Sequence, residues 1–456
     1  MSQFESFRYR CLDEVLETLN QLGIAWPRSD DFSVLFEPVE IHGKRLANRF
    51  VIQPMEGCDC NPDGSPTALV RRRYRRFAAG GAGMLWCEAC AVVPEGRANP
   101  RQMMLTDANV GKMASMLDDC RAAAQESMGS AHQPLFILQL THSGRYSKPE
   151  GKPAPIIAHH SSVLDPLMKI PADYPLISDE QLERLQDAYL KAASLAYEAG
   201  FDGVDVKACH GYLLAELLAS FTRTGSRYGG EEFESRTRMV REIHQRIHAS
   251  FPSLIVTSRM NVYDPIPYPY GWGCDRGDYR TWDLREPIKL VGALEEQGAE
   301  CVNITIGNPY YLPHYNRPYD TPVAGFQPPE EHPFVGVHRM LEIVREIQQA
   351  KPEVRVVGSG YSYLRQFMPW FASGLVRAGW VSLVGMGRGA LAYPDFVKDL
   401  AETGSMNPFK TCITCSNCTQ IMRDGGTTGC VIRDDEVYGA VYREGRRWVE
   451  DTIRRA

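Results

Sequence analysis

The sequence lacks the features that mark membrane, secreted and nucleic-acid-binding proteins. It has no apolar run of membrane-spanning length, and its start, MSQFESFRYR, has no apolar segment of the kind found in signal peptides. Its net charge of −6 leaves no basic excess, which argues against nucleic acid as the main partner. With 456 residues, 44% of them hydrophobic and 23% charged, the chain can build a large core without disulfide bonds.

Cysteines outside the C-terminal region are scattered along the chain. Cys87, Cys90 and Cys301 fall in apparent strands, where thiols would be a hazard in an oxidising compartment. We therefore expect a cytoplasmic protein with reduced thiols and no membrane partner.

Four of the 13 cysteines gather near the C-terminus, namely Cys412, Cys415, Cys418 and Cys430. The first three are separated by two residues each, so their sulfurs can turn inward on one loop, and the fourth can close a tetrahedron. This pattern is typical of an iron–sulfur cluster or a structural zinc site. The alternative is an incidental run of cysteines without a metal.

Short apolar strands alternate with amphipathic helices from Phe32 onward. Helical periodicity is clear at residues 179–199, 236–250, 286–297 and 338–349, and in a lead-in helix at 11–22. Eight strands are expected, at residues 50–54, 83–88, 135–140, 203–206, 254–259, 301–305, 354–358 and 380–384. This alternation predicts an α/β fold, a closed parallel (β/α)8 TIM barrel. We expect the barrel at residues 34–404, between an N-terminal helical extension (1–33) and a C-terminal cysteine-containing segment (405–456).

Polar residues follow five of the predicted strands. They occur at Gln53–Gly57, Glu88–Cys90, Gln139–Arg145, Lys207–Tyr212 and Arg259. Active sites of barrels are built at the carboxyl ends of the strands, so we expect these residues to form one site.

Two insertions follow the fifth and sixth strands, at residues 263–283 and 307–335, and both are rich in tyrosine and proline. We expect these loops to contact substrate. Capping of the barrel or an oligomer contact is the alternative.

Glycine loops follow the seventh and eighth strands, at residues 358–360 and 385–388. Glycines let backbone N–H groups approach an anion, and Arg388 adds a bidentate cation. Barrels commonly build a phosphate site from these two loops, which the sequence therefore predicts here.

Several longer segments carry a family resemblance. They are LFEPVEIHGKRLANRFVIQPM, GGAGMLWCEACAVVPEGR, LQLTHSGR, HGYLLAELL with SRYGG, and LVGMGRGALAYPDF. By them the chain resembles, over residues 34–404, the Old Yellow Enzyme family of flavin-dependent ene-reductases (NADH:flavin oxidoreductases). The cysteine segment resembles that of the branch related to 2,4-dienoyl-CoA reductase and trimethylamine dehydrogenase, which adds a [4Fe–4S] cluster. The resemblance implies a (β/α)8 barrel with FMN at its mouth.

The same resemblance assigns roles to residues of the predicted mouth. Tyr212 matches the family tyrosine that protonates the substrate carbon opposite the hydride, a task that suits a phenol at neutral pH. A packed aromatic side chain is the alternative for Tyr212. Gln139 matches the partner of the flavin pyrimidine edge, and Arg259 the cation near flavin N1. The other implied cofactor-binding residues are Pro54, Met55, Glu56, Ala89, Gly358, Ser359, Gly360, Gly385, Gly387 and Arg388.

Lys207, His210 and Glu56 depart from the family pattern. Lys207 and His210 stand where the family has His-x-x-His or His-x-x-Asn, the pair that binds the activating group of the substrate. Because lysine is a cationic donor, we expect the pair to polarise an anionic or strongly polarised acceptor, an enoate or enone. Glu56 stands where the family often has threonine or cysteine beside the flavin. An ionised carboxylate there would make flavin reduction harder, unless Glu56 only caps a turn.

The cysteine spacing departs as well, with two, two and eleven intervening residues against two, three and eleven in the relatives. Cys-x-x-Cys-x-x-Cys is itself a ferredoxin-type spacing, so a [4Fe–4S] cluster is the first expectation, with zinc or no metal as alternatives. Too few residues follow Cys430 for the dinucleotide-binding domains of the larger relatives, and no Gly-x-Gly-x-x-Gly follows a strand. Either NAD(P)H reduces FMN directly, or a separate electron-transfer protein feeds the cluster.

The sequence thus predicts an FMN-dependent oxidoreductase that reduces an activated C=C bond of a small-molecule substrate. Hydride would come from FMN N5 and the proton from Tyr212. The first alternative is an amine or alcohol dehydrogenase that passes electrons out through the cluster, and the second is a metal-bearing binding barrel without flavin. A homo-oligomer is expected by family analogy alone.

Overall fold

Eight parallel strands close into a barrel in the computed structural model, which describes the backbone of residues 3–455 and the side chains of residues 3–449. Each strand pairs with the next along the chain, and the last closes onto the first. The strands are β3 (Phe50–Ile52), β4 (Met84–Ala91), β5 (Leu135–Thr141), β6 (Gly203–Val206), β7 (Ile255–Asn261), β8 (Cys301–Thr305), β9 (Arg355–Gly358) and β10 (Leu383–Met386). This arrangement confirms the predicted (β/α)8 barrel.

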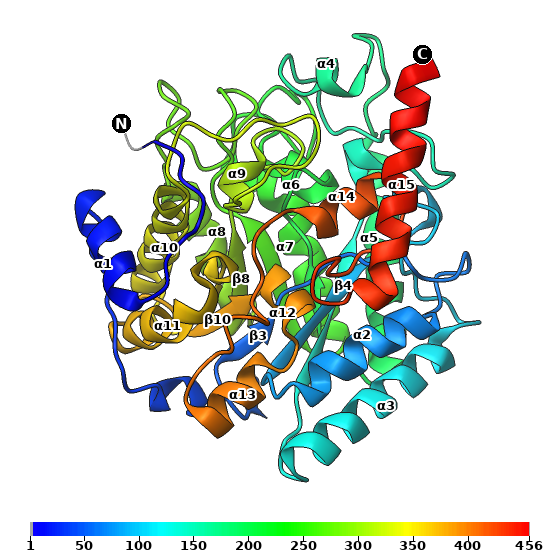
Figure 1. The fold of residues 1–456 in the computed structure, drawn as a ribbon. Helices are drawn as coiled ribbons and strands as arrows, with labels where there is room; N and C mark the ends of the chain where they lie inside the picture. Colours follow the sequence, from blue (N-terminus) through cyan, green and yellow to red (C-terminus); the bar gives the residue numbers. More distant parts are fainter. Residues whose placement is uncertain (1–2, 456) are drawn as a thin grey trace.

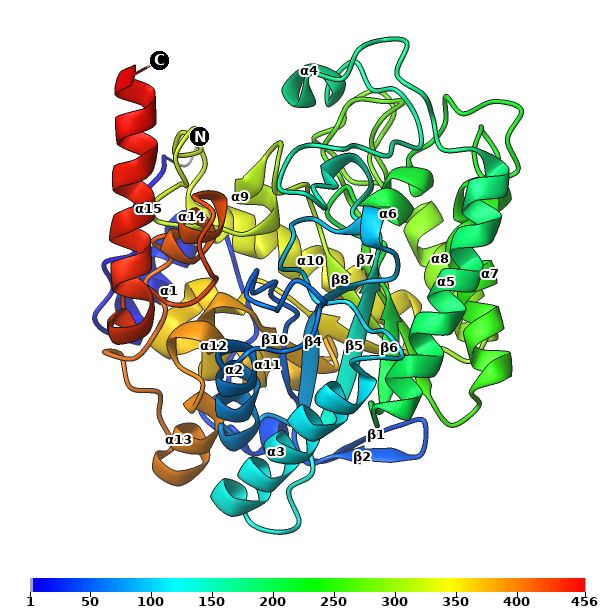
Figure 2. The same cartoon turned by 90° about the vertical axis from the view of Figure 1, so that its right-hand side faces the viewer.

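Helices surround the barrel and connect its strands, as Figures 1 and 2 show. They are α2 (Ala68–Ala79), α3 (Val110–Met128), α5 (Asp179–Glu198), α7 (Phe233–Ser250), α8 (Arg285–Glu296), α10 (Pro333–Ala350), α11 (Met368–Arg377), α12 (Arg388–Ala392) and α13 (Phe396–Thr403). The four helices expected between strands correspond to α5, α7, α8 and α10. At the start of α5, Ser178 and Gln181 form a capping box, which explains why the helix begins there.

Further elements precede the barrel, extend its loops and form the C-terminal segment. They are α1 (Leu12–Gln21), α4 (Asp165–Met168), α6 (Leu213–Leu218), α9 (Pro313–Asn316), α14 (Asn417–Arg423) and α15 (Asp435–Arg455), with 3₁₀ turns at Ser33–Phe36, Pro94–Gly96, Gly144–Tyr146 and Tyr361–Phe367. The predicted lead-in helix is α1. Among the described residues, no helix combines the length and the apolar character needed to cross a bilayer.

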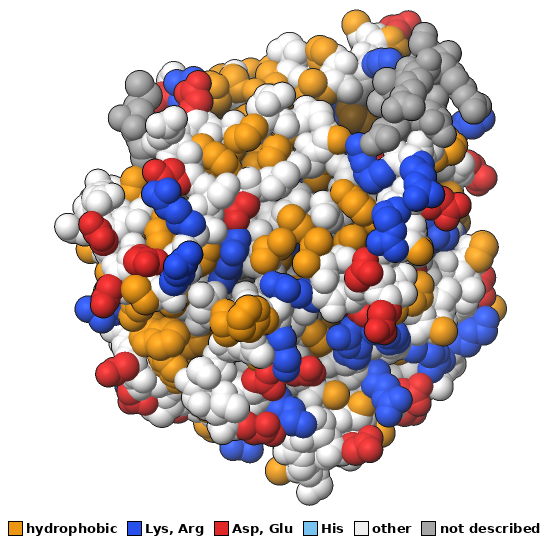
Figure 3. Space-filling model, viewed as in Figure 1, with side chains coloured by type: hydrophobic (Ala, Val, Ile, Leu, Met, Phe, Trp, Pro, Cys, Tyr) orange, Lys and Arg blue, Asp and Glu red, His pale blue; other side chains and the backbone are white. Residues whose placement is uncertain are grey.

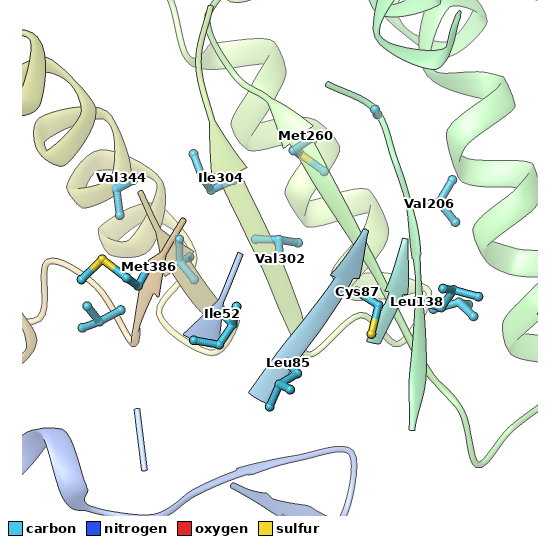
Figure 4. Close-up of a cluster of buried hydrophobic side chains, with 14 of the residues drawn as sticks. Ile52, Leu85, Cys87, Leu138, Val206, Met260, Val302, Ile304, Val344 and Met386 are labelled. Carbon is cyan, nitrogen blue, oxygen red and sulfur yellow. The ribbon is translucent and has the colours of Figure 1, made fainter. Parts of the chain in front are cut away.

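Alternate residues of each strand pack on opposite sides of the barrel wall, which gives two hydrophobic layers. Ile52 and Val302 join Val344 of α10 in the layer between strands and helices (Figure 4). Val51 and Trp86 belong to a second cluster inside the barrel. Because both faces are buried, the strands read as continuous apolar runs, the pattern from which they were predicted.

A two-stranded hairpin, β1 (Val39–Ile41) and β2 (Lys44–Leu46), covers the amino-terminal end of the barrel (Figure 2). Its buried Val39, Ile41 and Leu46 join the inner cluster of the barrel. The sequence gives little sign of this hairpin, because each strand has only three residues. Its position leaves the carboxyl ends of the strands as the open end.

The eighth barrel strand begins at Leu383, three residues later than the prediction of 380–384. The N–H of Trp380 donates to the carbonyl of Leu375, and that of Gly379, with φ 69°, donates to Val376. These bonds form a Schellman motif that ends α11. Trp380 therefore belongs to the helix terminus and not to the strand.

The C-terminal segment packs against the barrel on the side of α2 (Figures 1 and 2). Asp434 forms ion pairs with Arg72 at 2.8 Å and with Arg76 at 2.7 Å. The N–H of Thr428 donates to the carbonyl of Gly57 at 2.7 Å. The segment is therefore attached directly to the loop that follows β3.

Candidate active site

A cavity of about 1280 Å³, counted with its opening to solvent, lies at the carboxyl ends of the barrel strands. The predicted catalytic residues Lys207, His210 and Tyr212 all line it. So do the implied cofactor-binding residues Pro54, Met55, Glu56, Ala89, Gln139, Arg259, Ser359, Gly360, Gly385, Gly387 and Arg388. Gly358 does not line the cavity, because it ends β9 and its carbonyl accepts a hydrogen bond from Gln53 Nε2 at 3.2 Å.

A buried aspartate on β6 orients two of the expected flavin contacts. Asp205 Oδ2 accepts hydrogen bonds from Gln139 Nε2 at 2.6 Å and from Trp86 Nε1 at 2.8 Å, and Oδ1 accepts the backbone N–H of Arg259 at 2.6 Å. With its amide N–H engaged, Gln139 keeps its carbonyl oxygen as an acceptor for a ligand N–H. Arg259 Nε has no hydrogen-bond partner among the described residues.

The second glycine loop carries Arg388, whose guanidinium group makes only some of its possible hydrogen bonds. Arg388 Nη2 donates to the carbonyl of Pro318 at 2.6 Å, while Nη1 has no partner within the described chain. A side chain added at Gly387 would meet nothing closer than 3.8 Å, so the backbone there borders open space. An unsatisfied guanidinium beside accessible backbone is the arrangement that a phosphate group needs.

The Tyr212 phenol is buried between an amine and a second phenol. Lys207 Nζ lies 3.8 Å from the centroid of the Tyr212 ring, and Tyr212 Oη lies 3.4 Å from Tyr310 Oη. Burial, followed by the neighbouring Tyr310, raises the pKa of Tyr212 well above its usual value. Burial lowers the pKa of Lys207. Tyr212 therefore keeps its proton at neutral pH until a strong base develops beside it.

Glu56 places a carboxyl group in the same cavity. Its Oε1 accepts a hydrogen bond from Asn99 Nδ2 at 2.7 Å. Burial raises the pKa of Glu56 to about 7, and the nearby Lys207 opposes this rise. Glu56 therefore gains or loses its negative charge near neutral pH, and this change would act on a redox cofactor bound beside it.

His210 has a left-handed backbone, with φ 64°, and its N–H donates to Asn261 Oδ1 at 3.2 Å. Burial lowers the pKa of His210 well below its usual value, so the ring is neutral at pH 7. Its Nε2 has no partner in the part of the chain that the structure describes. A neutral imidazole in this position can form one hydrogen bond to a ligand.

Three residues of the site carry no sequence signal strong enough to select them. Arg317 lies in the long loop after β8, whose tyrosines, Tyr310 among them, are expected to contact substrate, but nothing marks the arginine. Arg423 comes from α14 of the C-terminal segment, and the sequence predicts no contact between this segment and the barrel mouth. Asp205 lies within a strand and is visible only through its hydrogen bonds.

The four cysteines of the C-terminal segment line a second, smaller cavity. Cys418, Arg388 and Leu391 also line the mouth cavity, so the two cavities share a wall. Burial raises the pKa of Cys412 to about 12, and Arg388 opposes this rise.

The cysteines lie around one space without converging on one point. Among the described residues, no three His, Cys, Asp or Glu side chains stand close enough together to hold a single metal ion. Zinc bound to thiolates at about 2.3 Å would need sulfurs within about 3.8 Å of one another. A [4Fe–4S] cluster spaces its thiolates more widely, because each binds a different iron.

The barrel, the glycine loops and the unsatisfied guanidinium groups of the mouth form the kind of site that binds a phosphate-bearing cofactor. A family model described as "NADH:flavin oxidoreductase / NADH oxidase family" matches residues 34–269. The chain belongs to this family, which confirms the resemblance seen in the sequence motifs.

Individual relatives agree with this assignment. The chain is 30% identical over 294 residues to an NADPH dehydrogenase of Halalkalibacterium halodurans, covering 64% of this chain and 78% of the relative. It is 25% identical over 394 residues to an NADH oxidase of Thermoanaerobacter brockii, covering 84% of this chain and 53% of the relative. The chain thus spans about half the length of that longer relative. A solved 2-naphthoyl-CoA reductase shares the fold, with a TM-score of 0.70 at 20% identity, over 90% of this chain and 58% of that one.

Proposed function

We propose that the protein is an ene-reductase that reduces an activated C=C bond of an enone or enoate. The observation that carries this proposal is the Tyr212 phenol with the Lys207 amine 3.8 Å from its ring, inside the cavity at the barrel mouth. FMN fits the residues present, because Arg259 Nε and Arg388 Nη1 are without partners among the described residues, as expected of groups that meet an anionic ligand.

When bound, FMN supplies hydride to the substrate. Tyr212 would give its phenolic proton to the substrate carbon opposite the one that receives hydride. Because the pKa of Tyr212 is raised, this transfer occurs only as negative charge develops on that carbon. Lys207 and His210 would hold the activating oxygen of the substrate, the first as a cation and the second as a neutral hydrogen-bond donor. A cationic partner favours enoates and strongly polarised enones.

The cysteine cavity supports a second cofactor. Cys412, Cys415, Cys418 and Cys430 would bind one [4Fe–4S] cluster, with zinc as the alternative. The wall shared with the mouth cavity would let electrons pass between the two cofactors. The shared wall favours a second candidate function, an amine or alcohol dehydrogenase that sends electrons out through the cluster.

Further proposals follow from the family and the sequence. The electron donor is NAD(P)H acting at the mouth or a separate electron-transfer protein acting through the cysteine site. The protein is cytoplasmic and homo-oligomeric, and the chain divides into an extension (1–33), the barrel (34–404) and the cysteine segment (405–456).

Anaerobic rapid mixing tests the proposal. The FMN-loaded protein, reduced by titration with dithionite, should be reoxidised by 2-cyclohexenone, and the flavin absorbance reports the step. A dehydrogenase would instead lose its oxidised-flavin absorbance when mixed with an amine or alcohol and would leave the enone untouched. A protein purified without flavin would contradict both functions. Iron at about four atoms per chain would support the cluster, and zinc would support the alternative.

A further inference from the structure

The mouth cavity contains more positive charge than its own acidic groups can balance. Within the described residues, Glu56 is the one carboxyl group on its wall, and none of the cations there forms an ion pair. Figure 3 shows that Lys and Arg side chains also gather on the molecular surface over α2 and α15. The cations of the cavity wall are Lys207, Arg259, Arg317, Arg388 and Arg423.

The flavin would account for only part of this charge. Arg259 and Arg388 are the cations that the family resemblance assigns to the isoalloxazine ring and the phosphate. Lys207 is engaged with the ring of Tyr212. Arg317 and Arg423 remain without an assigned role.

These two arginines lie at the rim of the cavity, on segments far apart in sequence. Arg317 follows α9 directly, and its Nε has no hydrogen-bond partner among the described residues. Arg423 is the last residue of α14, and its Nη2 donates to the carbonyl of Pro309 at 3.3 Å. Both side chains line the mouth cavity. Burial lowers the pKa of Arg317 to about 10, and the charges of Arg388 and Arg423 add to this effect.

Neighbouring guanidinium groups without a counter-ion are unfavourable unless an anion joins them. Arginine offers a planar fork that binds phosphate oxygens in pairs. Arg423 also lies near the proton donor, because its Nη2 donates to the carbonyl of Pro309, the residue before Tyr310, and Tyr310 Oη lies 3.4 Å from Tyr212 Oη. A reactant held at the rim would thus extend toward Tyr212.

We propose that Arg317 and Arg423 form a second anion site, which binds the phosphate or diphosphate group of a reactant. The orientation of that reactant, with its reacting end at Tyr212, rests on the proposed function. The group belongs to the hydride donor or to the unsaturated acceptor, since both can carry it.

Isothermal titration of the full-length, FMN-loaded protein with inorganic pyrophosphate tests the site directly. We expect Arg317→Gln and Arg423→Gln each to raise the dissociation constant about tenfold, as expected for the loss of one charge-assisted interaction. FMN and iron contents should stay unchanged. Arg184→Gln is the matched control, because Arg184 is exposed on α5 and lies outside the cavity wall. Loss of FMN in Arg317→Gln would assign that arginine to the cofactor phosphate, and loss of iron would assign it to the cysteine site. Either result, or an unchanged dissociation constant in both variants, overturns the proposal.

Steady-state inhibition separates the two sources of the phosphate group. Competition of pyrophosphate with NADH identifies the donor, and 1-benzyl-1,4-dihydronicotinamide, a hydride donor without any phosphate, should then show no effect of the variants on its KM. Competition of pyrophosphate with a phosphorylated unsaturated acceptor identifies the acceptor as the source of the phosphate group. Binding of pyrophosphate does not depend on turnover. If the protein reduces 2-cyclohexenone but does not bind pyrophosphate, the anion site alone is refuted. If the protein binds pyrophosphate but does not react with enones, the ene-reductase assignment alone is refuted.

Discussion

Glu56 should make the stability of the protein fall as pH rises toward neutrality. Burial raises the pKa of this carboxyl group from 4.5 to about 7 in the folded state. Between these values the folded protein keeps a proton that the unfolded chain has lost, so the free energy of unfolding decreases with increasing pH. The stability associated with the protonated group is fully present below about pH 4.5 and is lost as pH passes through about 7.

The size of the effect follows from the shift of 7 − 4.5 = 2.5 pKa units. At 1.36 kcal/mol per unit this is at most about 3 kcal/mol, a large part of the stability of a typical protein. Glu56→Gln removes the ionisation and keeps a side-chain oxygen that can accept the hydrogen bond from Asn99. We therefore expect the FMN-loaded variant to be about 1 kcal/mol more stable than the wild type at pH 5, where most unfolded chains have already lost the proton, and about 3 kcal/mol more stable at pH 8.

Denaturant-induced unfolding of both proteins across this pH range measures the difference. Glu95→Gln serves as the control, because Glu95 is exposed and its replacement should change stability little at either pH. A difference between wild type and Glu56→Gln that stays constant from pH 5 to pH 8 would refute the reasoning. It would mean that Glu56 is ionised in the folded protein over this whole pH range, because the charge of Lys207 lowers its pKa more than burial raises it.

Three further predictions concern the chemistry. Tyr212→Phe should slow reoxidation of reduced flavin by an enone about 10²- to 10⁴-fold and leave flavin reduction by NAD(P)H nearly unchanged, as measured by stopped-flow absorbance. Lys207→Met should raise KM or lower kcat about tenfold for a carboxylated acceptor and much less for 2-cyclohexenone, and unchanged constants would argue against a role in binding the activating group. Cys415→Ser should remove about four irons per chain by elemental analysis while FMN remains bound, whereas equal loss of FMN would show that the two sites do not form independently.

The barrel could be predicted from the sequence because its strands are buried on both faces. The runs Phe50–Ile52 and Leu135–Leu138 are apolar at every position, and apolar residues recur every third or fourth position in the helices between strands. The hairpin of β1 and β2 was missed because three-residue strands give too short a pattern. The start of β10 was misplaced because Trp380 looks like a strand residue, while its N–H serves the end of α11.

The active-site cavity could be predicted wherever a residue follows a strand or belongs to a family motif. Gln139, Lys207 and Tyr212 meet that condition, and all line the cavity. Asp205 could not be selected, because its importance depends on hydrogen bonds to residues of other strands. Arg423 could not be selected either, because nothing local to α14 shows that the C-terminal segment packs on the barrel mouth.

The C-terminal segment forms part of the wall of the mouth cavity as well as carrying the cysteines. Its α14 supplies Cys418 and Arg423 to the cavity wall. It is fixed to the β3 loop by the hydrogen bond from Thr428 to Gly57, the residue next to Glu56. A change in the cysteine cavity that moves this segment would therefore move the wall of the mouth and the loop that carries Glu56. The cysteine cavity and the mouth cavity are thus joined through the wall that they share and through the contact of this segment with the β3 loop.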